Sequence, residues 1–193
     1  NEVLKFSPNS SNKIRVIPNP VNSEFSFQRY SFNPHLPKIL IVGTKPNKNL
    51  ELIILALAGL NCELVILGKL NITQIALLKS HQISFSNQFN LNLKEVIKIY
   101  QDCDMLCFPS TYEGFGLPII EAQATGRPVI TSNIGAMKEV AGESACLVDP
   151  FDGKSIREGI EKVILDKEYR EVLIQNGLEN VNKYKIETIA QQY

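Results

Sequence analysis

The sequence predicts an α/β fold built on one doubly wound parallel sheet, with charged helices at its carboxy-terminal end. Three observations support this fold class. From residue 38 onward, short runs rich in aliphatic and β-branched residues alternate with segments of helical periodicity. The runs are almost continuously apolar, which is typical of parallel strands buried on both faces. The segment 153–193 is charged and amphipathic, a pattern that indicates helices covering a core.

The elements are expected in a regular order along the chain. Residues 1–36 are rich in Asn, Ser and Pro and hold one short strand candidate, KIRVI at 13–17, so a linker or edge segment is expected there. Residues 37–166 form the expected sheet domain, and residues 167–193 the expected carboxy-terminal helices. We expect strands at 38–43, 62–68, 83–85, 104–109, 128–132 and 145–149, and helices near 49–60, 71–80, 92–102, 116–126 and 135–141.

Composition excludes several classes of function. Lys+Arg and Asp+Glu number 20 each, so there is no overall basic field to attract nucleic acid or an anionic membrane, and any anion site must be local. The apolar stretch 50–68 is interrupted by Glu51 and Glu63, which predicts a core helix and strand rather than a membrane span. His35 and His81 are far apart and lack companion ligands, so no metal is expected. The four cysteines have no CxxC spacing and lie in apolar stretches, as reduced cysteines of a cytosolic protein do.

The stretch PSTYEGFGLPIIEAQATGRPVI, at 109–130, carries the expected chemistry. It follows a predicted strand, and ligands of open parallel sheets bind beyond the carboxyl ends of the strands. Gly114 and Gly116 let a ligand approach the backbone closely. Pro118 suits a first helical turn, so a helix is expected to begin near Gly116, and its free N–H groups and dipole would provide a local anion site. A diphosphate fits such a site.

Two glutamates flank these glycines. Glu113 precedes them on the loop, where its carboxylate could accept hydrogen bonds from sugar hydroxyls or face positive charge developing at an anomeric carbon. Glu121 lies more than one turn into the helix, where it could accept from a ribose diol. The spacing alone favours the ordinary interpretation, in which Glu113 is a loop charge and Glu121 a solvated helix residue, and it is the surrounding sequence that points to a site.

At these residues the sequence resembles a known family. EGFGLPIIEA is similar to the E-x7-E signature of retaining GT-B glycosyltransferases, of the family 4-like or group 1 kind. IRVIPNPVNSEF resembles the interdomain segment of these enzymes, ILIVGTKPNKNLEL their first strand and phosphate loop, and GRPVITSNIGAMKEVAGESACLVDP the elements after the signature. The resemblance covers roughly residues 14–165. It implies a single Rossmann-like domain, the carboxy-terminal half of a GT-B fold, whose last helices pack back toward a missing amino-terminal acceptor domain.

The resemblance also implies roles for individual residues. Glu113 is expected to be the catalytic residue, in contact with the donor sugar, and Glu121 to hold the nucleotide ribose. The backbone between them is expected to lie against the sugar and diphosphate, at Gly114, Phe115, Gly116 and Leu117.

Further donor-binding candidates follow the first and third strands. Lys48 matches a lysine that contacts the diphosphate in the family. Thr44 stands where the family usually carries Arg, and Lys45 could replace that residue only as a point charge rather than a bidentate fork. Gln88 and Phe89 are candidates for lining the base pocket.

The resemblance implies a whole enzyme that transfers a hexose with retention from a nucleotide sugar to a glycan or lipid-linked acceptor. TSN followed by MKEVAG resembles mannosyltransferases, which favours mannose from GDP-mannose. No cofactor or metal is expected, and no nucleic acid partner. The expected location is the cytoplasm, with peripheral association at the inner face of the cytoplasmic membrane. This half by itself is expected to be inactive without its amino-terminal domain.

Two alternatives remain open from the sequence. A non-catalytic, flavodoxin-like nucleotide-binding module would carry an acidic cluster or a flavin phosphate loop after the first strand, and VGTKPNK offers neither. A GT-B nucleotide-sugar epimerase would require further catalytic acids and histidines, which are not identifiable. Comparing the binding of nucleotide sugars with that of flavin mononucleotide distinguishes the first alternative from a glycosyltransferase.

Overall fold

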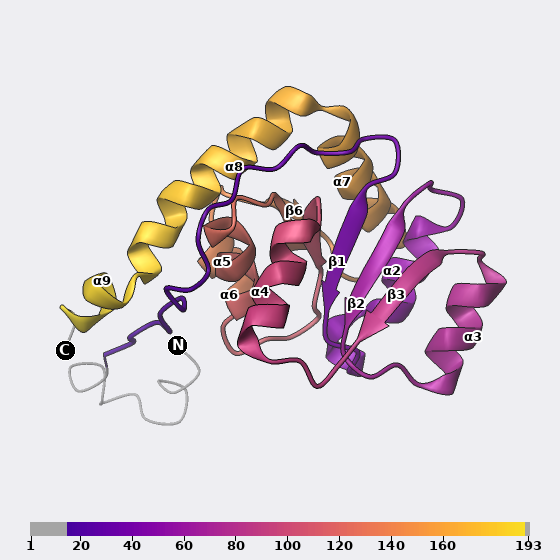
Figure 1. The fold of residues 1–193 in the computed structure, drawn as a ribbon, viewed down its shortest axis with the longest axis horizontal. Coiled ribbons are helices and arrows are strands. Elements are labelled where there is room, and N and C mark those ends of the chain that lie inside the picture. The colour runs from indigo at the N-terminus through magenta and orange to yellow at the C-terminus, as the bar shows by residue number, and fades with distance from the viewer. Residues whose placement is uncertain (1–14, 192–193) are drawn as a thin grey trace.

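The structure, a computed structural model, describes residues 15–191, and one parallel sheet lies at its centre (Figure 1). The strand order is β3-β2-β1-β4-β5-β6, so the direction of winding reverses between β1 and β4. Every neighbouring pair is parallel. The strands are β1 (Lys38–Val42), β2 (Glu63–Leu67), β3 (Ser84–Gln88), β4 (Met105–Phe108), β5 (Val129–Ser132) and β6 (Cys146–Val148).

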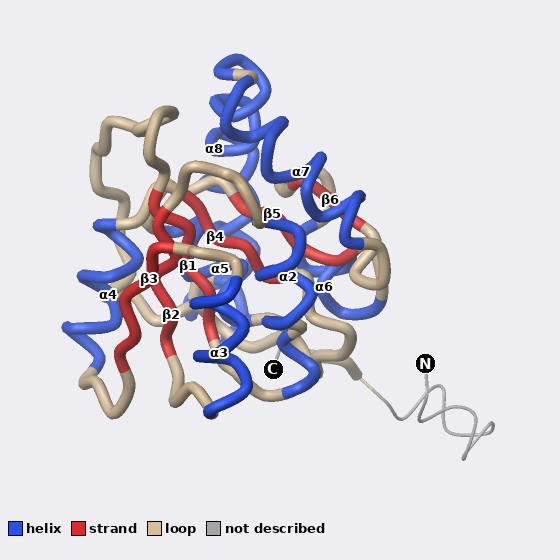
Figure 2. The backbone as a smooth tube through the Cα atoms, turned by 90° about the vertical axis from the view of Figure 1, so that its right-hand side faces the viewer, coloured by secondary structure: helices blue, strands red, loops and turns tan. Residues whose placement is uncertain are grey.

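Helices connect the strands and cover both faces of the sheet (Figure 2). The helices that follow β1 to β5 are α2 (Leu50–Leu57), α3 (Ile72–Ser80), α4 (Leu93–Asp102), α5 (Leu117–Ala124) and α6 (Gly135–Ala141). After β6 come α7 (Gly153–Leu165), α8 (Lys167–Val181) and α9 (Ile186–Ala190). Two short 3₁₀ turns complete the set, η2 (Pro46–Lys48) and η3 (Asn182–Tyr184).

Alternate side chains of β1 enter two different cores. Ile39 and Ile41 pack in a cluster with α2, α3 and α7, whereas Leu40 packs in a second cluster with α4, α5 and α6. This period of two is what a strand buried on both faces requires. The doubly wound parallel fold predicted from the apolar strands is therefore confirmed.

The predicted strands and helices match those of the structure to within a few residues. The exception in length is β3, predicted at 83–85, which continues to Gln88 because it pairs residue for residue with β2. The predicted strand at 13–17 is wrong for its described part: residues 15–17 are not in a strand, and 13–14 lie outside the described residues. Two prolines, Pro18 and Pro20, follow this segment, and proline cannot donate to a sheet ladder.

The segment ahead of β1 is fastened to the carboxy-terminal helices. It runs beside α8 in Figure 1, and the N–H of Val21 donates to the carbonyl of Tyr184 at 2.8 Å. Phe25 is buried and meets the ring of Tyr100 edge-on, with centroids 5.3 Å apart. At the other end of the segment the guanidinium of Arg170 lies 3.9 Å from the Phe32 ring centroid. The first and last described segments thus share one surface of the domain.

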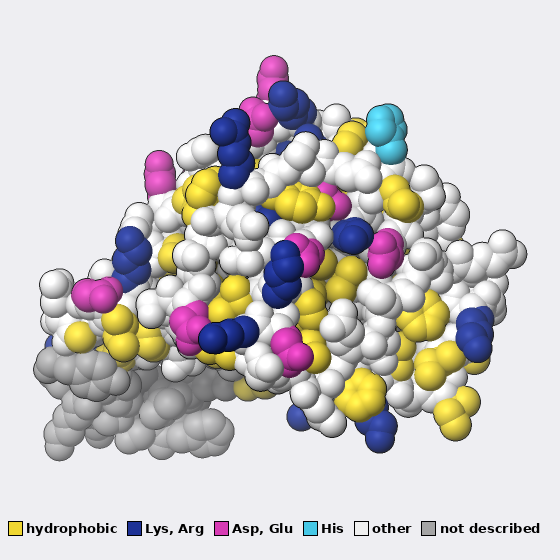
Figure 3. Space-filling model, in the orientation of Figure 1, with side chains coloured by type: hydrophobic (Ala, Val, Ile, Leu, Met, Phe, Trp, Pro, Cys, Tyr) yellow, Lys and Arg dark blue, Asp and Glu magenta, His cyan; other side chains and the backbone are white. Residues whose placement is uncertain are grey.

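Charges of both signs are scattered over the face seen in Figure 3. This distribution agrees with the zero formal net charge of the sequence. Within residues 15–191, no helix has the length and apolar character needed to cross a membrane.

Candidate functional site

The loops after β1 and β4 meet at the point where the strand order reverses. The N–H of Thr111 donates to the carbonyl of Asn47 at 2.9 Å. The side-chain amide of Asn49 donates to the carbonyls of Pro109 at 3.1 Å and Pro150 at 2.6 Å. Ligands of doubly wound sheets bind in the crevice at this reversal. The two loops are therefore joined where the topology alone would place a site.

An ion pair joins the two loops. The Lys48 ammonium lies 2.7 Å from Glu113 Oε1, and the Asn47 amide donates to the same oxygen at 3.2 Å. The Lys48 and Glu113 side chains are only 18% and 14% exposed, and the ammonium also lies 4.5 Å from the Phe108 ring centroid. Two donors and limited exposure fix the Glu113 carboxylate in one position. A Cβ at Gly43 would come within 2.9 Å of the Lys48 side chain, so glycine gives the lysine its space.

The two glycines after Glu113 have different structural roles. Gly116 is the N-cap of α5 with a φ of 106°, a conformation that other L-residues rarely adopt. A Cβ there would also lie 3.1 Å from Ile119. A Cβ at Gly114 would meet no atom of the described part of the chain within 4 Å. Helix α5 begins at Leu117, as the sequence predicts, and its first turn leaves N–H groups without intrahelical acceptors.

Glu121 is held from the neighbouring helix. The hydroxyl of Tyr100, on α4, donates to Glu121 Oε2 at 2.7 Å. Burial raises the pKa of the Glu121 carboxyl, and the hydrogen bond from Tyr100 acts in the opposite direction. The Tyr100 side chain is fully buried, and its own pKa is raised by burial and by Glu121. Glu121 is therefore an oriented carboxylate between α4 and α5, and not the solvated helix residue that spacing alone allows.

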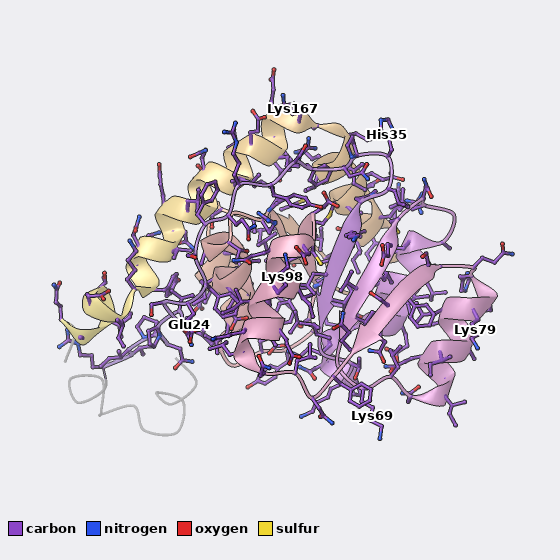
Figure 4. The ribbon with its side chains drawn as sticks, viewed as in Figure 1. Glu24, His35, Lys69, Lys79, Lys98 and Lys167 are labelled. Carbon is purple, nitrogen blue, oxygen red and sulfur yellow. The ribbon has the colours of Figure 1, made fainter. Side chains whose placement is uncertain are left out.

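A pocket of about 330 Å³ opens at the carboxyl ends of β2 and β3. Gln88 and Phe89, the two candidates for a base pocket, line it, and Figure 4 shows Lys69 at this edge of the sheet. Val96 lines the pocket one helical turn before Tyr100, so both face the same side of α4. Helix α4 thus contributes Val96 to the pocket and Tyr100 to the contact with Glu121. The full lining of the pocket is Leu67, Gly68, Lys69, Gln88, Phe89, Asn90, Leu91 and Val96.

Thr44 and Lys45 differ in their surroundings. The Thr44 hydroxyl donates to the carbonyl of Lys69 at 2.8 Å and so joins the loops after β1 and β2. Lys45 is exposed, and within residues 15–191 its ammonium makes no hydrogen bond or ion pair. Thr44 thus has a structural partner, whereas Lys45 is available to an anion.

Phe115 and Leu117 differ in their surroundings. The Phe115 ring packs edge-on against Tyr184, with centroids 5.7 Å apart, so its side chain belongs to the carboxy-terminal contact. Leu117 is 38% exposed at the start of α5. Only the backbone of Phe115 remains a candidate for ligand contact.

Sequence reasoning missed three residues that shape the site. Asn47 and Asn49 tie the loops together, and Asn49 adopts a left-handed φ of 62°. The PNKN turn signal could have indicated such a role, because asparagine tolerates this conformation. Tyr100 gave no signal, since it occupies an ordinary apolar position in its helix and lies 21 residues before Glu121.

His35 lies at the opposite end of the molecule from Lys69 (Figure 4). Among the described residues no group of three His, Cys, Asp or Glu side chains could hold a metal ion. The expectation that the reaction needs no metal or cofactor stays a prediction.

Comparison with known proteins identifies the family. Residues 22–180 match the model of the family "Glycosyl transferases group 1", and the chain belongs to this family. It is 29% identical over 207 residues to "Serotype-specific mannosyltransferase WbdA" of Escherichia coli, covering 95% of this chain and 25% of that protein. It is 35% identical over 141 residues to "Capsular polysaccharide biosynthesis glycosyltransferase CapM" of Staphylococcus aureus, covering 69% of this chain and 37% of that protein.

The fold matches solved glycosyltransferase structures. Sucrose-phosphate synthase from Thermosynechococcus elongatus superposes with a TM-score of 0.83 at 22% identity, covering 99% of this chain and 53% of that chain. The chain therefore spans about half of this structure and a quarter to about a third of the two curated relatives. The Rossmann-like fold and the glycosyltransferase family, both implied by the sequence resemblance, are confirmed.

Proposed function

We propose that this member of the group 1 glycosyltransferases is the donor-binding domain of a retaining enzyme. The whole enzyme would transfer a hexose, with mannose as the first candidate, to a glycan or lipid-linked acceptor. One observation carries the proposal: Lys48 and Glu113 meet at 2.7 Å where the strand order reverses, beside a helix that begins at an open glycine-rich loop. Two relatives named for mannosyl transfer and capsular polysaccharide synthesis support it.

In this proposal, each region of the site would hold one part of the donor. The pocket lined by Gln88 and Phe89 would take the base, and Glu121 the ribose. The start of α5 and the Lys48 ammonium would hold the diphosphate, because a helix N-terminus and a lysine both favour anions. Lys45 would add a second, mobile charge.

Glu113 would then face the sugar. Binding of a diphosphate would draw Lys48 away from Oε1, leaving the carboxylate to the sugar hydroxyls and to positive charge at the anomeric carbon. In the transfer, the bond from the anomeric carbon to the diphosphate breaks and the acceptor oxygen forms the new bond. The diphosphate leaves with the electron pair, its freed oxygen takes the proton that the acceptor hydroxyl gives up, and its remaining charge is met by Lys48 and the helix. The acceptor domain, the membrane face and the cytoplasmic location belong to the proposed whole enzyme.

Calorimetric binding of GDP-, UDP- and ADP-sugars to this chain tests the proposal. At least one should bind, and Glu121→Gln should weaken it roughly tenfold, the value of one charged hydrogen bond. Glu158→Gln, an exposed residue of α7, is the matched control and should bind as the unmodified chain does. Flavin mononucleotide binding equally well, or no nucleotide sugar binding at all, would contradict the proposal.

A further inference from the structure

We propose that Tyr100 is a positioning residue for the donor ribose: it holds Oε2 of Glu121 and turns Oε1 toward the ribose hydroxyls. This inference rests on the proposed function, because it assumes a nucleotide whose base occupies the pocket lined by Gln88 and Phe89. It assigns a role to a buried residue of α4 that lies outside the glycine-rich loop and its two glutamates.

The first step is the geometry of the carboxylate. Oε2 accepts from the Tyr100 hydroxyl at 2.7 Å, and Oε1 makes no hydrogen bond within residues 15–191. In this part of the chain, Ser110 Oγ is the one buried side-chain polar atom without a partner. Oε1 also has no partner among these residues but is not among the buried atoms, so it is accessible to solvent. Glu121 thus has one oxygen occupied by protein and one free to accept.

The second step is the rigidity of Tyr100. Its side chain is 1% exposed, and its ring meets Phe25 edge-on with centroids 5.3 Å apart. A buried tyrosine hydroxyl requires a hydrogen-bond partner, and Glu121 is the one it has among the described residues. The packed ring therefore fixes the hydroxyl, and the hydroxyl fixes the carboxylate.

The third step is the relation to the pocket. Val96 lines the pocket and lies four residues before Tyr100, so the two share one face of α4. A base between Phe89 and Val96 would place its ribose along this face, toward Glu121. Two successive turns of α4 would then serve two successive parts of one nucleoside.

The hydrogen bond also affects ionisation. Burial raises the pKa of Glu121, and the bond from Tyr100 lowers it. Tyr100, on α4, is the titratable group that contributes to this shift, and Cys103, which follows α4, acts on Tyr100. A protonated carboxyl is a poorer acceptor for a diol. Removing the Tyr100 hydroxyl should therefore raise the Glu121 pKa, and nucleotide binding should then be lost at a higher pH as the pH falls.

Tyr100→Phe tests the inference, because it keeps the ring and removes the hydroxyl. The probe is whichever of GDP, UDP or ADP binds the unmodified chain, compared with its 2′,3′-dideoxy form by calorimetry from pH 5 to 8. We expect about tenfold weaker binding of the ribonucleotide and little change for the dideoxy form. Tyr169→Phe is the matched control, because it also removes a tyrosine hydroxyl but lies in α8, outside the proposed site. It should change neither the affinity for the ribonucleotide nor that for the dideoxy form.

A second measurement needs no ligand. Carbon-13 NMR of the Glu121 carboxyl should give a higher pKa in Tyr100→Phe than in the unmodified chain and in Tyr169→Phe. An unchanged Glu121 pKa, or equal losses for the ribo and dideoxy forms, would overturn the inference while the proposed function stands. If no nucleoside diphosphate binds the unmodified chain, the proposed function fails and the ribose role of Tyr100 fails with it.

Discussion

At the scale of single residues, the Lys48–Glu113 pair is a structural contact between two loops and also a part of the proposed donor site. It is too buried to be a freely solvated surface pair and too exposed to be a core ion pair, with side-chain exposures of 18% and 14%. Asn47 adds a second donor to the same carboxylate oxygen. Losing Lys48 would leave Glu113 with a single neutral donor in a partly desolvated place. The pair should therefore stabilise the free domain as well as prepare it for a diphosphate.

The first prediction is a stability difference between two neighbouring lysines. Lys48→Met should lower the free energy of unfolding by about 1–2 kcal/mol, between the values for exposed and for buried pairs. Lys45→Met, at an exposed position, should stay within about 0.5 kcal/mol. Urea unfolding measures both. In the double variant Lys48→Met/Glu113→Gln the losses should be non-additive. Equal stabilities for the two lysine variants would show that the pair contributes nothing.

At the scale of elements, the two glycines ahead of α5 are expected to have different roles. Gly116 is needed for the backbone conformation, whereas Gly114 lies beside open space that a ligand could occupy. Gly116 is required by its φ of 106° and by the contact with Ile119. No neighbour within residues 15–191 requires a glycine at position 114, since a Cβ there would meet open space. If Gly114 is needed, the reason lies in what approaches it from outside.

The second prediction follows from this contrast. Gly116→Ala should lower the free energy of unfolding by about 1–3 kcal/mol, because alanine is strained at this φ. Gly114→Ala should unfold like the unmodified chain but bind the nucleotide sugar more weakly, because its methyl group would occupy the space of the diphosphate or sugar. Urea unfolding and calorimetric binding should be measured on both variants, so that each variant serves as the control for the other. Full binding by Gly114→Ala would remove the glycine-rich loop from the proposed site.

Elements could be predicted because their hydrophobic periods are local. The apolar runs of β1 and β2 and the periodic segments behind them are readable along the chain. The full length of β3, with the polar sequence SFSNQ, could not be read along the chain in this way. Its extension to Gln88 depends on pairing with β2 across space. The mispredicted strand at 13–17 shows the converse: β propensity without a partner strand does not produce a strand in its described part.

At the scale of the whole molecule, the meeting of distant segments could not be derived from residue patterns. The glycine-rich loop and the family resemblance indicated a site at Glu113 and Glu121, but the contact of Glu113 with Lys48 depends on β1 lying beside β4. The contact of Glu121 with Tyr100 depends on how α4 packs against α5. Family resemblance anticipated Lys48 without explaining it, and it did not anticipate Tyr100.

Arg127 joins several of these distant segments. Its guanidinium is buried and donates to backbone carbonyls of Cys103 at 2.8 Å, Gln28 at 3.1 Å and Thr125 at 2.9 Å, and also to that of Gln101. One side chain thereby connects the segment ahead of β1, the end of α4 and the end of α5. Burial lowers its pKa, and the neighbouring acidic groups oppose that shift.

The third prediction concerns this connection. Arg127→Met should lower the free energy of unfolding by at least about 3 kcal/mol, because several buried carbonyls would lose their donor at once. Arg127→Lys should recover little of this, since one ammonium cannot reach carbonyls spread around a planar fork. Arg157→Met is the control: Arg157 donates to the carbonyls of Ala56 and Ala58 but is part-exposed, so water can replace it. Urea unfolding should therefore give a much lower free energy of unfolding for Arg127→Met than for Arg157→Met. Equal losses in the free energy of unfolding would mean that Arg127 only places a positive charge near the carboxy-terminal end of α5 and does not hold the three segments together.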